Sequence, residues 1–173
     1  MQRRVLGNVH RYILPTINGL AGLYTLQGNY DEAERLFIEA LEGQSRKSGD
    51  EHPSTLVSMN GLAVLRTKQK RYNEAESLFI ESLEGRKRKL GEEHPATLGS
   101  KNDFAVLYIK QKRYDEAEPL LLEAVNGRIQ KLKLQHPHTK ESIKTLIELY
   151  EAWNKPEKAE QWRAKLAATN DAE

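Results

Sequence analysis

The sequence contains few of the residues that would indicate a compartment or a catalytic chemistry. It has no cysteine, which excludes a disulfide framework and a thiolate metal site. No apolar run approaches the roughly 18 residues of a membrane span, and the N-terminus lacks the apolar core of a secretory signal. The net charge is only +2, too weak a bias to indicate nucleic acid or an anionic membrane as the partner. We therefore expect a cytoplasmic protein that binds neither.

What the sequence does contain is a 42-residue repeat. His52, His94 and His136 are spaced by this period, and residues 49–90 and 91–132 are identical at 25 of 42 positions. Self-similarity at a fixed period of this length is typical of stacked supersecondary units. Function is therefore expected on a repeating surface rather than in one catalytic pocket.

Each period contains two helical stretches. In the first, Leu56, Met59, Leu62 and other apolar residues recur mainly at spacings of three and four, the helical period. A turn of two or three residues before the second stretch makes the two helices antiparallel neighbours. The spacing leaves no room for strands, so we predict an all-α fold. The expected helices are about 11–27, 30–47, 53–69, 72–89, 95–111, 114–132, 138–153 and 156–168.

The two ends of the chain depart from the repeat. Leu6-Gly7 and His10 match Leu90-Gly91 and His94 two periods later. This match indicates either a segment of a longer array or a vestigial first unit. Near the other end, polar substitutions such as Lys140 and Lys144 are typical of a terminal cap. We predict a single repeat domain over 1–173, divided into a tail of a preceding repeat (1–10), repeats at 11–48, 49–90 and 91–132, a degenerate capping repeat (133–168) and a flexible tail (169–173).

The units resemble the tetratricopeptide repeat. That family has a Leu-Gly-x-x-Tyr pattern, followed by an alanine, an aromatic residue and another alanine at fixed distances. The first unit supplies Leu20, Ala21, Tyr24, Ala33, Phe37 and Ala40, and the later units follow with substitutions. The ordinary repeat has about 34 residues, and the longer 42-residue form resembles the repeats of kinesin light chains. The resemblance implies a right-handed superhelical solenoid of antiparallel helix pairs that acts as a protein-binding scaffold or adaptor.

The resemblance also implies a concave groove lined by the first helix of each pair. Lysines at its margins favour an acidic partner segment, and Lys101 adds long-range attraction. The predicted groove residues are Asn18, Asn60, Asn102, Val64, Val106, Thr67, Lys68, Lys101, Ile109 and Lys110. For the three asparagines two interpretations stay open: they contact the backbone of a bound peptide, or they bond the neighbouring helix and hold the stack together.

Other repeated features also have two interpretations. The basic C-terminal halves of the second helices either complement the helix dipole or form a stripe that attracts an acidic partner. The repeated histidines are better explained as helix caps than as metal ligands, because they fall in different loops. Gly43, Gly85 and Gly127 indicate close approach of the next first helix. We expect no cofactor, no metal and no enzymatic activity. The alternative function is a self-associating segment, since Ile13, Leu14 and Ile17 lack a preceding neighbour.

Overall fold

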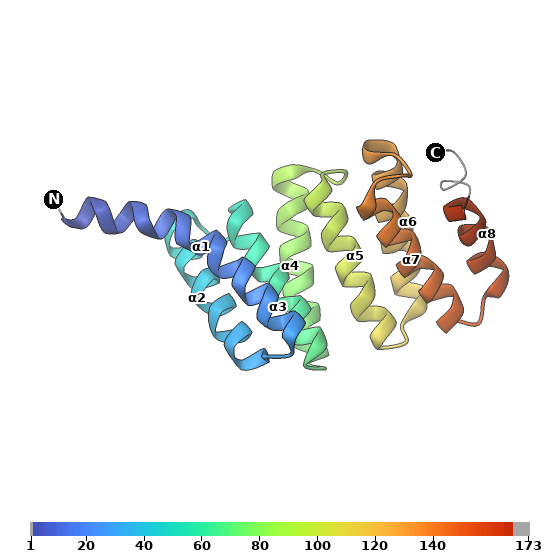
Figure 1. Cartoon of the computed structure of the whole chain (residues 1–173), viewed down its shortest axis with the longest axis horizontal. Helices are drawn as coiled ribbons and strands as arrows, with labels where there is room; N and C mark the ends of the chain where they lie inside the picture. Colours follow the sequence, from blue (N-terminus) through green and yellow to red (C-terminus); the bar gives the residue numbers. More distant parts are fainter. Residues whose placement is uncertain (1, 168–173) are drawn as a thin grey trace. The chain divides into compact units, whose positions relative to one another are not determined.

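The computed structural model describes the backbone of residues 2–167 and the side chains of residue 14 and residues 16–167. This range contains eight α-helices and no strand, which confirms the all-α prediction (Figure 1). Odd-numbered helices are the first of each pair and are called A helices, and even-numbered ones are called B helices. The helices are α1 (Gln2–Gln27), α2 (Tyr30–Ser48), α3 (Pro53–Lys68), α4 (Tyr72–Leu90), α5 (Pro95–Lys110), α6 (Tyr114–Leu132), α7 (Pro137–Ala152) and α8 (Pro156–Ala167).

The chain forms two compact units. Unit 1 spans Met1–Lys89 and unit 2 spans Leu90–Glu173. In unit 1, α2 packs against both α1 and α3, and the two A helices also touch each other. In unit 2, α6 packs against α5 and α7, α8 packs against α7, and α5 touches α7. Each unit therefore places two A helices side by side, as Figure 1 shows.

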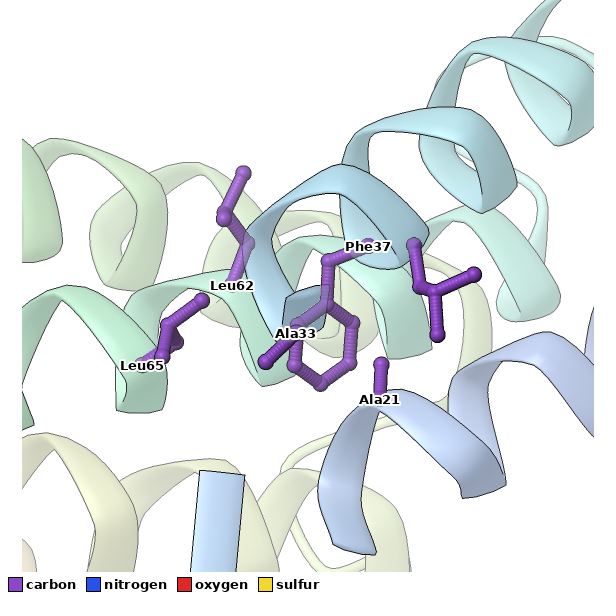
Figure 2. Close-up of a cluster of buried hydrophobic side chains, with 6 residues drawn as sticks. Ala21, Ala33, Phe37, Leu62 and Leu65 are labelled. Atoms are coloured by element: carbon purple, nitrogen blue, oxygen red, sulfur yellow. The ribbon is translucent and has the colours of Figure 1, made fainter. Parts of the chain in front are cut away.

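The core of unit 1 joins three helices through one aromatic ring. Phe37 of α2 packs with Ala21 of α1, Ala33 of its own helix, and Leu62 and Leu65 of α3 (Figure 2). Both alanines are completely buried, so the small side chains allow the helices to approach closely, as the sequence predicts. Gly61 of α3 faces the same ring, and a Cβ there would collide with it.

The histidine before each later A helix caps that helix. The Nδ1 atom of His52 accepts a hydrogen bond from the backbone N–H of Ser54 at 3.2 Å. His94 does the same for Ala96 at 3.1 Å, and His136 for His138 at 3.2 Å. A proline follows each histidine at the first helical position, where no amide hydrogen bond is lost. The predicted capping role is confirmed.

The glycines inside the B helices relieve a contact within their own helix pair. A Cβ on Gly85 of α4 would lie 2.6 Å from Leu56 of α3, and one on Gly127 of α6 would lie 2.7 Å from Leu98 of α5. Close approach was expected, but of the next A helix. The structure corrects this, because the contacting leucine comes from the A helix of the same pair.

The N-terminal helix is longer than predicted. It has 26 residues, whereas α3 has 16, and no helix end lies near residue 10. The reason is local: the His-Pro pair that starts the later A helices is replaced by His10-Arg11, and arginine continues a helix where proline would end the preceding one. Residues 2–10 are therefore part of α1 rather than the end of a separate helix. The predicted flexible tail at 169–173 lies outside the described residues.

Candidate functional site

Asn18 and Asn102 each bond the next A helix of their own unit. In unit 1, the Asn18 Nδ2 of α1 donates to Ser58 Oγ of α3 at 2.7 Å. In unit 2, Ser142 Oγ of α7 donates to Asn102 Oδ1 of α5 at 2.7 Å. Asn60 and Asn102 are mostly buried, with 8% and 7% of their surface exposed. The contacts of Asn18 and Asn102 therefore support the interpretation in which the amides hold neighbouring A helices together.

A residue from the intervening B helix completes each of these contacts. Ser58 Oγ donates to Gln44 Oε1 of α2 at 2.6 Å. In unit 2, Arg128 of α6 donates to Ser142 Oγ and to the backbone carbonyl of His138, the latter at 2.8 Å. Burial lowers the pKa of the Arg128 guanidinium. We call each set of three side chains a polar seam: Asn18–Ser58–Gln44 in unit 1 and Asn102–Ser142–Arg128 in unit 2.

Lys101 does not lie on an open groove surface. Only 3% of the residue is exposed, and its Nζ atom lies 2.6 Å from Glu92 and 2.8 Å from Glu123. Burial alone would lower the pKa of Lys101, but hydrogen bonds to Glu123 and Glu92 outweigh it and raise the pKa. Its charge is thus satisfied within the unit, contrary to the predicted role in long-range attraction. The sequence could have indicated that Lys101 is buried, because the equivalent positions in the other repeats, Ile17, Met59 and Ile143, are all apolar.

The basic ends of the B helices are likewise engaged within their own units. Arg86 is 6% exposed and donates to the carbonyl of Leu56 at 3.2 Å. Arg88 and Lys89 both pair with Glu51. In unit 2, Lys131 pairs with Glu93 at 3.2 Å. These contacts support the structural interpretation over a free cationic stripe.

The predicted groove residues Val64 and Lys68 lie along exposed ridges of the A helices of unit 1, together with neighbouring positions on α1 and α3. On α3, Val57 is 47% exposed, Val64 is partly exposed and Lys68 is exposed. On α1, Gly22 is partly exposed and Leu26 is 77% exposed. Thr67 is instead buried, and its hydroxyl donates to the Ala63 carbonyl at 2.9 Å. We define the unit 1 ridge as Gly22, Leu26, Val57, Val64 and Lys68, a surface that is apolar with one positive charge.

The ridge of unit 2 has a different charge. On α5, Gly99, Val106 and Ile109 are partly exposed and Lys110 is exposed. On α7, the positions equivalent to Gly99 and Val106 are Glu141 and Glu148, and both are exposed, as is Lys144. We define the unit 2 ridge as Gly99, Val106, Ile109, Lys110, Glu141, Lys144 and Glu148. The acidic half had not been predicted, although Glu141 and Glu148 stand two periods after Val57 and Val64.

Each unit also has a shallow pocket at the loop that leads into an A helix. The pocket in unit 1 has a volume of about 500 Å³ and is lined by residues 48–53 and Lys89. Its counterpart in unit 2 has about 450 Å³ and is lined by residues 90–95 and Lys131. Among the described residues, no group of three His, Asp or Glu side chains lies close enough to hold a metal ion. Within the same range, no helix is long and apolar enough to cross a membrane.

The fold and the polar seams define a protein of stacked helix pairs whose exposed ridges recur from pair to pair. A family model of the tetratricopeptide repeat matches residues 12–88 and 59–130, more than half of the chain. The chain therefore belongs to the tetratricopeptide repeat family, and its repeats are of the kinesin light chain-like type. Proteins of this fold generally serve as scaffolds for protein–protein interaction. No curated protein sequence matches significantly.

Solved structures similar to this chain include two of a putative kinesin light chain with nearly identical TPR-like repeats from Podosopora anserina. The first, a form with a single substitution, has a TM-score of 0.83 and 26% identity, with 94% of this chain and 77% of that chain covered. The second has a TM-score of 0.82 and 26% identity, with 92% and 75% covered. BtubC (BKLC) from P. vanneervenii has a TM-score of 0.79 and 23% identity. The alignment covers 93% of this chain and 66% of BtubC, just under two thirds of that protein's length.

Proposed function

We propose that this chain is an adaptor that holds a segment of a partner protein against the ridges of its A helices. The observation that carries the proposal is the exposed apolar surface of the unit 1 ridge. Leu26 and Val57 are 77% and 47% exposed, although they belong to helices whose other faces are buried. Exposed apolar side chains grouped on one surface are typical of interaction sites.

The charges on the ridges indicate the chemistry of the partner. Lys68 in unit 1 and Lys110 in unit 2 are exposed, and neither forms a salt bridge within the described part of the chain. An acidic side chain of the partner would pair with them. The exposed Glu141 and Glu148 of α7 favour a basic side chain instead. We therefore propose apolar and acidic partner residues for the ridge of unit 1. For the ridge of unit 2 we propose an acidic residue opposite Lys110 and a basic residue opposite Glu141 and Glu148.

In this proposal Asn102 also contacts the partner directly. Ser142 occupies the Oδ1 atom of Asn102, while its Nδ2 atom has no protein partner among the described residues. An amide N–H donor of this kind matches the carbonyl of an extended peptide. Asn102 can thus hold the seam with one atom and contact the partner with the other. We assign no enzymatic step, cofactor or metal to the protein, and we place its action in the cytoplasm.

The proposal is tested by a peptide-array screen followed by titration of the strongest peptide. Val57→Glu combined with Lys68→Glu should weaken its binding by about tenfold or more, about 1.4 kcal/mol, as measured by fluorescence anisotropy. The matched control is Ile80→Glu on α4, which changes a residue that is 50% exposed away from the ridges. Unchanged affinity in the ridge variant, or an equal loss in the control, would refute the ridge as the binding surface.

A further inference from the structure

Arg128 of α6 is a buried cation without a carboxylate partner in the described part of the chain. Only 8% of the residue is exposed. Its Nη1 atom donates to two neutral acceptors, Ser142 Oγ and the carbonyl of His138. Its Nε and Nη2 atoms have no hydrogen-bond acceptor among the described residues. The side chain therefore keeps three N–H donors unused.

Other cations that are buried to a similar degree are paired. Each of two such side chains lies within salt-bridge distance of two carboxylates: Arg66 near Glu34 and Glu74, and Lys101 near Glu92 and Glu123. A buried charge without such a partner is destabilising, because nothing offsets the loss of its hydration. Burial accordingly lowers the pKa of Arg128, although the charges of Glu141 and Asp103 oppose this effect. An anion that reached Arg128 would relieve this cost.

The unused edge of Arg128 is accessible from the unit 2 ridge at Gly99. A Cβ on Gly99 would lie 3.7 Å from Arg128 Nη2 and would meet nothing else within 4 Å. Gly99 is itself partly exposed, and neither Nε nor Nη2 is among the fully enclosed atoms that lack a partner. Packing does not require a glycine here, since 3.7 Å is an ordinary contact, and glycine lowers the helix propensity of α5. The missing side chain thus leaves the guanidinium within reach of a ligand.

The geometry of the unused donors favours a carboxylate. Nε and Nη2 lie along one edge of the guanidinium plane, and this edge can donate two parallel hydrogen bonds to the two oxygens of a carboxylate. A phosphate could accept the same bonds, but it carries more negative charge. Glu141 and Asp103 already act electrostatically on Arg128, so they would repel a dianion more than a singly charged carboxylate.

We propose that Arg128 and Gly99 form a subsite for one acidic side chain of the partner segment. The inference rests on the proposed function, because the carboxylate belongs to that segment. Asn102 lies beside the subsite, since it and Arg128 contact the same hydroxyl of Ser142. Its Nδ2 atom stays available for a backbone carbonyl next to the acidic residue. In the seam of unit 1 the B helix supplies Gln44, which has no charge, so the acidic residue selects unit 2.

NMR titration of the isotope-labelled full chain with sodium acetate tests the subsite without a partner. The Nε–H resonance of Arg128 is assigned by its loss in Arg128→Gln, which introduces the residue type that the unit 1 seam contains. In the wild type this resonance should shift with half-saturation below about 50 mM acetate. Sodium chloride at the same ionic strength should cause less than about a tenth of the shift.

Gly99→Val separates access from the polar seam. This variant keeps Arg128 and its bonds, and the second repeat already combines Val57 with Arg86 at the equivalent positions. It should weaken acetate binding at least about tenfold. The matched control is Gly19→Val on α1, where an added Cβ also meets nothing within 4 Å, and it should leave acetate binding unchanged. An acetate response that persists in Gly99→Val overturns the subsite, as does a wild type without any response.

Two further measurements identify the occupant. Inorganic phosphate that shifts the resonance at a lower concentration than acetate overturns the assignment to a carboxylate. In the strongest array peptide, each Asp or Glu is replaced in turn by Asn or Gln. One replacement should weaken binding to the wild type at least about tenfold and binding to Arg128→Gln less than about twofold; equal losses in both proteins overturn the proposal. Absence of any peptide binding would instead refute the proposed function, while the acetate titration still decides on the subsite.

Discussion

The polar seams of the two units use the same positions but differ in the residue that the B helix supplies. In unit 1, Asn18 Nδ2 donates to Ser58 Oγ, and this hydroxyl lies 2.6 Å from Gln44 Oε1 and 2.9 Å from Asn18 Oδ1, so it can donate to either. In unit 2, Arg128 donates to Ser142, which donates to Asn102. Glutamine carries both a donor and an acceptor, whereas arginine can only donate. The arginine therefore fixes the direction of the unit 2 seam, while the amides of unit 1 allow either direction.

The contacts next to the A–B turns differ in a similar way. In unit 1, Glu34 of α2 pairs with Arg66 of α3 and also with Arg71. In unit 2, the equivalent Glu118 of α6 accepts a hydrogen bond from Tyr150 of α7 at 2.8 Å and pairs with Lys158. The carboxylate at this repeat position can therefore be paired with a charged donor from the next A helix, as with Arg66, or with a neutral one, as with Tyr150.

The largest expected effect concerns the two seams. Arg128→Leu removes the donors to Ser142 and to the His138 carbonyl at a buried site, and should lower the free energy of unfolding by about 2–3 kcal/mol. Gln44→Leu removes one neutral acceptor and should cost about 1 kcal/mol. Urea denaturation of both variants checks the difference. Equal losses would mean that the charge of the B-helix residue has no energetic consequence for the seam.

A smaller effect on the free energy of unfolding is expected at low pH, and it comes from Glu34 of unit 1. The hydrogen bond from Arg66 lowers the pKa of Glu34 from 4.5 to about 2, although burial opposes it. Because the folded pKa is depressed, the stabilisation is present above pH 4.5 and is lost as the pH falls towards 2. After solvent screening it amounts to about 1 kcal/mol.

Thermal melts between pH 6 and pH 2.5 measure this loss. Glu34→Gln should remove that part of the pH dependence. Glu118→Gln is the matched control in unit 2. Burial raises the pKa of Glu118, but hydrogen bonds from Lys158 and Tyr150 outweigh it and lower the pKa; this variant should leave the contribution of Glu34 in place. If Glu34→Gln keeps the full acid sensitivity of the wild type, another group is responsible.

The smallest effect compares a buried glycine with an exposed one. Gly127→Ala places a Cβ 2.7 Å from Leu98 and should destabilise the protein by about 1 kcal/mol, since the strain exceeds the gain in helix propensity. Gly22→Ala meets nothing within 4 Å and should stabilise it by about 0.5–1 kcal/mol. Differential scanning calorimetry resolves both. A stabilising Gly127→Ala would show that Leu98 can move aside without cost.

The sequence predicts the helices well because their ends are encoded locally. His-Pro pairs start α3, α5 and α7, and the apolar period then defines which face is buried. The start of α1 was missed because His10-Arg11 lacks the proline that marks the other starts. Lys101 was misplaced because a lysine normally indicates a surface, whereas this one is paired with Glu92 and Glu123 across two elements. Such partners are 9 and 22 positions away in the sequence, a separation that periodicity does not reveal.

The asparagines show how far the candidate site could be predicted from the sequence. Their spacing shows that they occupy one position in each repeat, but it does not show which atom meets which neighbour. The bond between Asn18 and Ser58 spans 40 residues, and so does the bond between Asn102 and Ser142. Only the packing of adjacent A helices brings these pairs together. The sequence predicts an uncovered apolar face on the first helix at Ile13, Leu14 and Ile17, but the structure buries Leu14 and exposes Leu20 and Leu23 instead.

The polar seam also restricts how a chain of this kind can change its length. Each seam joins an asparagine of one repeat to a serine of the following repeat. Gain or loss of a whole 42-residue period at the sequence level restores the 40-residue spacing at the new junction. An insertion or deletion of another length inside one of the helices moves one partner out of register and leaves a buried amide or hydroxyl unpaired. Gene duplication and excision in whole repeats would therefore be tolerated, and frame-preserving indels of other sizes within an A or B helix would be selected against.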